Sequence, residues 1–157
     1  MSTATGTATE NKQEVTIAKV GQPAPDFNLP STKNMETLAE NISLSDYKGK
    51  WLILLFYPLD FTFVCPTELT AFSDRLDELN GIGAEVLGVS TDSVHSHRAW
   101  VKTPRDQNGI ADLQYPLLSD VGGKLAAKYN ILVEEANIAL RGLFIINPDG
   151  ILQYAVV

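Results

Sequence analysis

Residues 51–69, WLILLFYPLDFTFVCPTEL, join an apolar run to a segment with the pattern of a helix start. The run is short and apolar throughout up to Pro58, which is typical of a central strand buried on both faces. Pro66 suits the first position of a helix, and Glu68 suits its first turn. The stretch therefore predicts a strand, a loop and a helix in succession, as in an α/β fold.

The same alternation continues along the chain. The hydrophobic spacing and the turn residues predict the following elements: a strand over 51–57, a helix over 66–79, a strand over 84–90, a helix capped near Asp92 or Ser93, a short strand over 116–120, a helix from Asp120 to Asn130, and a hairpin over 142–157 that turns at 147–150. Strands that alternate with helices indicate a central mixed sheet, largely parallel and flanked by helices.

Composition limits the classes of protein that the chain can represent. Its 157 residues suit one domain, and we expect a flexible tail over 1–14 followed by a domain over 15–157. A net charge of −7 argues against a nucleic-acid partner. No apolar run approaches the roughly 18 residues of a membrane span. A single free cysteine suits the reducing cytoplasm.

That cysteine, Cys65, lies where the predicted helix begins. The unpaired N–H groups and the positive end of the helix dipole favour an anion there, and such positions lower the pKa of a thiol. A lone cysteine in a protein is more often a buried and inert apolar residue. Position alone leaves both interpretations open.

The neighbours of Cys65 carry a family resemblance. Pro58, Thr62 and Cys65 form the pattern Pro-x-x-x-Thr-x-x-Cys, and the whole segment FYPLDFTFVCPTEL resembles the active-site segment of the typical two-cysteine peroxiredoxins. Further blocks resemble that subgroup in the same order: VGQPAPDF, SLSDYKGKW, VLGVSTDSVHSHRAW, YPLLSD and RGLFIINPDG. The resemblance runs from about residue 17 to the end of the chain.

This resemblance implies a thioredoxin-like fold and a peroxidase that uses no metal, haem or other cofactor. Cys65 matches the peroxidatic cysteine, whose thiolate attacks a hydroperoxide and becomes a sulfenic acid. Thr62 matches a threonine whose hydroxyl aligns the peroxide, and Pro58 matches a proline that shields the thiolate from water. The backbone N–H groups of Val64 and Cys65 are candidate oxygen stabilisers.

Three further residues complete the implied site. Arg141 matches the family's catalytic arginine, a fixed cation for the negative charge on the leaving oxygen. Glu68 matches a glutamate that orients this arginine. Trp100 matches a tryptophan near the active site, for which we expect a packing role.

The chain also departs from the subgroup. Its typical members carry a resolving cysteine in a carboxyl-terminal extension, and this chain has no second cysteine and stops at Val157 inside an apolar strand. We therefore expect a longer parent protein that carries this tail and is recycled by a thioredoxin-type reductant. The resemblance also implies a homodimer or a decamer built from such dimers.

Two other functions fit parts of the same evidence. An oligomeric holdase chaperone or a redox-signalling subunit is the main alternative. A thiol reductase is disfavoured because Glu68 stands where a Cys-x-x-Cys pair needs its second cysteine. His95 and His97 are two residues apart on a predicted helix, so we expect surface positions and neither a metal pair nor a Cys-His hydrolase.

Overall fold

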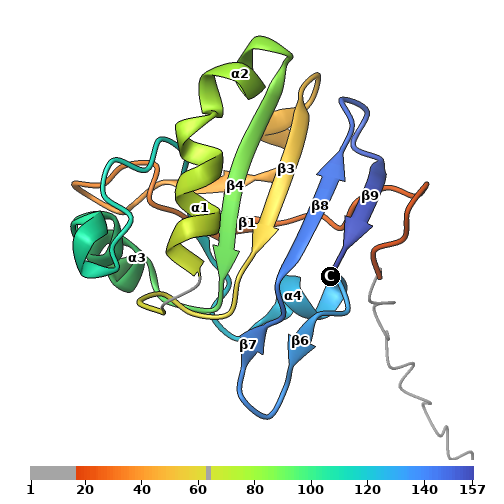
Figure 1. Ribbon diagram of the computed structural model, residues 1–157. Helices are drawn as coiled ribbons and strands as arrows, with labels where there is room; N and C mark the ends of the chain where they lie inside the picture. Colours follow the sequence, from red (N-terminus) through yellow and green to blue (C-terminus); the bar gives the residue numbers. More distant parts are fainter. Residues whose placement is uncertain (1–16, 63–64) are drawn as a thin grey trace, which may run out of the picture.

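A computed structural model describes residues 17–62 and 65–157, and its centre is a five-stranded mixed sheet (Figure 1). The strand order is β5-β4-β3-β8-β9, in which β3 pairs in parallel with β4 and β4 with β5, while β3–β8 and β8–β9 are antiparallel. The bounds are β3 (Trp51–Phe56), β4 (Ala84–Ser90), β5 (Leu117–Ser119), β8 (Gly142–Ile146) and β9 (Leu152–Val156). The predicted α/β fold with a mixed sheet is confirmed.

The two faces of this sheet carry separate hydrophobic cores. One core includes side chains from α1 (Cys65–Asp74), α2 (Leu76–Gly81) and α3 (Val94–Val101). The other includes side chains from α4 (Lys124–Lys128) and the segment with β1 (Asn28–Pro30) and β2 (Asn41–Ser43). The remaining elements are η1 (Leu44–Tyr47), η2 (Arg105–Gln107), β6 (Leu132–Val133) and β7 (Ile138–Ala139). None of the helices in the described ranges has both the length and the apolar content needed to cross a bilayer.

The central strand β3 separates these cores. Leu52 and Leu54 face one core and Ile53 and Leu55 the other, because side chains alternate along a strand. This explains why the run is apolar without interruption. Trp51 is the exception to the expected burial, since it begins the strand and is 39% exposed.

Two predicted helix caps are present. The Ser93 side chain accepts a hydrogen bond from the backbone N–H of Ser96 at 3.2 Å at the start of α3. The Asp120 carboxylate accepts from the N–H groups of Leu125 and Ala126 at 3.0 and 2.9 Å. Burial raises the pKa of Asp120 above its ordinary value, although the two hydrogen bonds act to lower this pKa.

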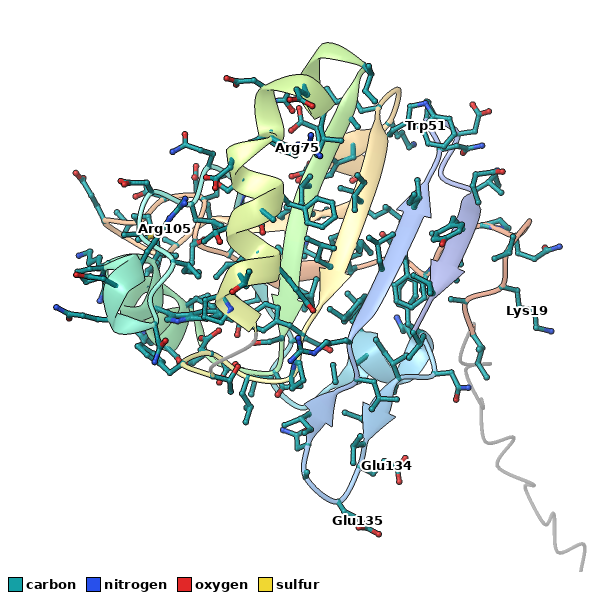
Figure 2. All side chains as sticks on the ribbon, viewed as in Figure 1. Lys19, Trp51, Arg75, Arg105, Glu134 and Glu135 are labelled. Atoms are coloured by element: carbon teal, nitrogen blue, oxygen red, sulfur yellow. The ribbon has the colours of Figure 1, made fainter. Side chains whose placement is uncertain are left out.

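The expected single helix over 66–79 is divided at Arg75, which separates α1 from α2. The end of α1 coincides with a tertiary contact, in which the Arg105 guanidinium donates to both oxygens of Asp74 at 3.1 and 3.0 Å. Figure 2 labels Arg75 at the junction and Arg105 in the loop beside α1. The apolar spacing hid this break, because Leu69 and Leu76 reach the same core from the two helices.

Candidate active site

The candidate site lies at the end of the sheet where β3 and β4 finish. Residues 57–62, called the active-site loop below, leave β3 there, and α1 begins with Cys65 (Figure 1). Phe56 at the end of β3 is the register partner of Gly142 at the start of β8. Arg141 therefore lies beside the point where the active-site loop begins. The side chain of Cys65 and the predicted contribution of Val64 lie outside the described residues.

Arg141 and Glu68 are brought together as the sequence predicted. Arg141 Nη1 donates to Glu68 Oε1 at 3.0 Å, with the two side chains 36% and 54% exposed. Because Glu68 occupies the first turn of α1, the ion pair holds the guanidinium next to the helix start. Such an exposed pair contributes at most about 1 kcal/mol to stability, so its importance lies in where it places the charge.

A groove of about 250 Å³ opens beside this ion pair. Glu68 and Arg141 line it together with apolar side chains that include Leu69, Phe72 and Leu143. The guanidinium thus lies at the boundary between a polar helix start and an apolar groove.

The active-site loop carries Thr62 and Pro58, both half-buried. The Thr62 hydroxyl donates to the backbone oxygen of Leu59 at 3.1 Å, which closes a tight turn. Within this turn Phe61 has φ +61°, a left-handed conformation that is uncommon for a residue other than glycine. The loop is therefore compact and locally strained.

Trp100 packs beneath the active-site loop. It is fully buried, and its indole N–H donates to the backbone oxygen of Asn108 at 2.8 Å. Its ring centroid lies 5.6 Å from that of Tyr57 and 6.1 Å from that of Phe61. Trp100 thus supports the loop from the core.

The expected surface position of His97 is wrong. His95 is exposed, whereas the His97 side chain is fully buried and its Nδ1 lies 2.8 Å from Asp60 Oδ2. The physical reason is helical spacing: His97 lies three residues before the buried Trp100, so both occupy the face of α3 that packs on the core. That spacing was available in the sequence and could have placed His97 inside.

Sequence reasoning also missed the polar partners of this histidine. The Tyr57 hydroxyl donates to Asp60 Oδ1 at 2.7 Å, and the backbone N–H of Asp60 donates to Asp92 Oδ2 at 2.9 Å. Burial raises the pKa of Tyr57 well above its ordinary 10.0, and the adjacent Asp60 carboxylate raises it further. Together, Tyr57, Asp60, Asp92 and His97 form what is called the buried network below.

Three members of the buried network could offer ligand atoms to a metal ion. One such atom from each of Asp60, Asp92 and His97 lies within 4.8 Å of the other two. These carboxylate oxygens already accept hydrogen bonds from protein donors, including the Ser90 hydroxyl at 2.6 Å from Asp92 Oδ2. The arrangement fits a set of hydrogen bonds that holds the active-site loop better than it fits a cation site.

Solved structures with the same arrangement define the class of protein. The chain matches a reduced 2-Cys peroxiredoxin from Plasmodium vivax with a TM-score of 0.82 and 37% identity, over 88% of this chain and 84% of that one. It matches the AhpC protein of Enterococcus faecalis with a TM-score of 0.79 and 34% identity, over 90% of this chain and 81% of that one. The fold is the thioredoxin-like fold of the peroxiredoxins.

The sequence comparisons define the family. The model of the AhpC/TSA family matches residues 20–155, and the chain belongs to this family. It is 52% identical over 141 residues to a putative peroxiredoxin of Synechocystis, covering 90% of this chain and 70% of that relative. It is 51% identical over 145 residues to a chloroplastic 2-Cys peroxiredoxin of Hordeum vulgare, covering 92% of this chain and 68% of that relative. The chain is thus a peroxiredoxin enzyme with a thiol peroxidase function.

Proposed function

We propose that Cys65 reduces hydrogen peroxide and organic hydroperoxides through a sulfenic acid intermediate. The observation that carries this proposal is the placement of Cys65 at the first residue of α1, with Arg141 held 3.0 Å from Glu68 in the first turn of the same helix. A helix start favours the thiolate, and a neighbouring cation favours it further.

The reaction balances with the Cys65 thiolate, the peroxide and one proton from solvent. The Cys65 thiolate forms a bond to the terminal peroxide oxygen, and the O–O bond breaks. The sulfur loses two electrons and becomes a sulfenic acid, while the leaving oxygen takes a proton from solvent and departs as water or an alcohol.

Each neighbouring residue has a role in this step. The Arg141 guanidinium stabilises the charge that grows on the leaving oxygen. The Thr62 hydroxyl aligns the peroxide, Pro58 limits water around the thiolate, and the N–H groups of Val64 and Cys65 stabilise oxygen. The half-buried positions of Thr62 and Pro58 in the compact active-site loop support these assignments.

The enzyme's regeneration needs a second thiol. We propose the typical two-cysteine type, with a resolving cysteine in a carboxyl-terminal tail of the parent protein and a thioredoxin-type reductant in the cytoplasm. Relatives named as 2-Cys peroxiredoxins support the type, and a Plasmodium yoelii neighbour is named as a thioredoxin peroxidase. A homodimer, or a decamer built from such dimers, is proposed from the same resemblance.

A holdase chaperone is a second candidate function, and one observation favours it. The edge strand β9 exposes Tyr154 and Val156, with 50% and 47% of their surfaces exposed. Such an apolar edge suits the capture of unfolded chains. Suppression of a client's aggregation by the Cys65→Ser variant supports this function, because that variant has no peroxidase thiol.

The peroxidase proposal is tested by trapping the intermediate. The reduced chain is mixed with hydrogen peroxide and a dione that reacts with sulfenic acids, and the adduct is located by mass spectrometry. We expect rapid stoichiometric labelling at Cys65, none in Cys65→Ser and much slower labelling in Arg141→Ala. Labelling of the wild-type chain no faster than that of free cysteine contradicts the proposal.

A further inference from the structure

We propose that His97 is a positioning residue for peroxide reduction. Through Asp60 it holds the active-site loop in the shape that presents Pro58 and Thr62 to the substrate. This inference rests on the proposed peroxidase function and adds to it a residue that does not touch the reacting atoms.

The contact between His97 and the loop is buried and direct. His97 Nδ1 lies 2.8 Å from Asp60 Oδ2, with side-chain exposures of 0% and 1%. No bulk water is available here as an alternative partner, so both groups depend on hydrogen bonds within the protein. Loss of His97 leaves Asp60 Oδ2 with the Ser96 hydroxyl alone. Loss of Asp60 leaves His97 Nδ1 with only the longer 3.3 Å contact to the Tyr57 hydroxyl.

The other ring nitrogen of His97 connects the loop to the sheet. Nε2 lies 2.9 Å from the backbone oxygen of Leu118 in β5. A carbonyl oxygen only accepts, so Nε2 carries a hydrogen and donates. The imidazole thus bridges the rigid sheet and the Asp60 carboxylate, and one proton lies between Nδ1 and Asp60 Oδ2.

Asp60 is held from further directions as well. The Ser96 hydroxyl donates to Oδ2 at 2.9 Å and the Tyr57 hydroxyl donates to Oδ1 at 2.7 Å. The backbone N–H of Asp60 donates to Asp92 at 2.9 Å. Both the side chain and the backbone of Asp60 are therefore fixed in position.

The active-site loop needs such a fixed point. The left-handed conformation of Phe61 directly follows Asp60, and the Thr62 hydroxyl closes back on Leu59. A strained residue keeps its conformation only when its neighbours are held in place. Release of Asp60 lets Phe61 relax, and the adjacent Thr62 moves with it. A displacement of about 1 Å costs up to about 100-fold in rate for a group that aligns a substrate.

Two substitutions of His97 separate its hydrogen bonds. His97→Asn retains an N–H near the position of Nδ1 and so a donor to Asp60. His97→Gln retains an N–H near the position of Nε2 and so only the bond to Leu118. The matched control is His95→Asn, which changes an exposed histidine on the same helix.

The measurement compares two reactions of Cys65 in the reduced full chain. Oxidation by hydrogen peroxide depends on alignment by the loop, whereas alkylation by iodoacetamide reports only the reactivity of the thiolate. We expect His97→Gln to lower the peroxide rate by about tenfold or more and the alkylation rate by less than about threefold. His97→Asn and His95→Asn keep both rates at those of the wild type within the error of the measurement.

A third variant covers the case in which His97→Gln does not fold. Ser96→Ala removes one donor to Asp60 from a half-buried position, and we expect about a threefold loss with peroxide alone. Wild-type peroxide rates in His97→Gln or, if it does not fold, in Ser96→Ala overturn the inference. An equal loss with both reagents, or a loss in His97→Asn as large as in His97→Gln, also overturns it. A wild-type chain no more reactive than free cysteine instead contradicts the proposed function.

Discussion

Two side-chain pairs lie at the same end of the sheet, and they differ in almost every physical respect. The Asp60–His97 pair is buried, with exposures of 1% and 0%, and is surrounded by further hydrogen bonds. The Arg141–Glu68 pair is open to solvent, with exposures of 36% and 54%. One is enclosed by the core, and the other lines a groove.

The two pairs suit different tasks at the proposed site. A buried pair is costly to break and fixes geometry, which suits the proposed role of the loop in aligning a peroxide. An exposed pair is weak and screened by salt, and this one places the Arg141 cation at the solvent-accessible start of α1. The first pair provides a fixed shape, and the second provides accessible charge.

Removal of the buried Asp60 carboxylate is expected to have the largest effect on stability. Asp60→Ala leaves His97 and Tyr57 without their partner, so we expect the free energy of unfolding to fall by about 3–5 kcal/mol. Urea unfolding followed by circular dichroism measures the change. The control Asp77→Ala alters an exposed carboxylate of α2 and is expected to change stability by less than about 1 kcal/mol. Similar values for both variants contradict the importance of the buried network.

A milder change to the same network has a pH signature. Tyr57→Phe removes the hydroxyl bonded to Asp60, at an expected loss of about 1 kcal/mol at pH 7. The pKa of Tyr57 is raised in the folded chain, so the unfolded chain ionises first as the pH rises past about 10. Wild-type stability therefore falls more steeply above pH 10 than that of the variant. Parallel stability curves for the two proteins contradict this assignment.

Loss of the exposed Arg141–Glu68 pair is expected to affect the rate of peroxide oxidation more than the stability of the fold. Glu68→Gln lowers stability by less than about 1 kcal/mol. It slows peroxide oxidation of Cys65 by about threefold, because the charged hydrogen bond between Glu68 and Arg141 at the helix start is weakened. Glu78→Gln is the control, since Glu78 forms a more exposed pair with Arg75 in a different part of the chain. A rate unchanged by Glu68→Gln removes Glu68 from the positioning of Arg141.

Much of this arrangement follows from local sequence signals. The strand over 84–90 has the predicted bounds, and the caps at Ser93 and Asp120 form as expected. The meeting of Arg141 and Glu68 was predicted from the family resemblance, whereas periodicity supplied only the strand and the helix that carry them. Short-range patterns succeed here because strand alternation and caps are properties of neighbouring residues.

The buried network and the break at Arg75 depend on contacts between residues that are far apart in the sequence. Asp60 and His97 are 37 residues apart, and only the packing of α3 on the core brings them together. The break at Arg75 likewise coincides with contacts from a separate loop to Asp74. The partners of His97 are set by tertiary structure and could not be predicted from the sequence, although its spacing from Trp100 could have placed it in the core.

The most direct test of the site compares Cys65 in the folded chain with Cys65 in the same chain unfolded in urea. The second-order rate constant for oxidation by hydrogen peroxide is measured at one pH, with alkylation by iodoacetamide measured in parallel. We predict that folding accelerates oxidation by at least about 100-fold, and far more than it accelerates alkylation, because only the folded loop and Arg141 act on the peroxide. Equal acceleration of the two reactions, or none, contradicts the account.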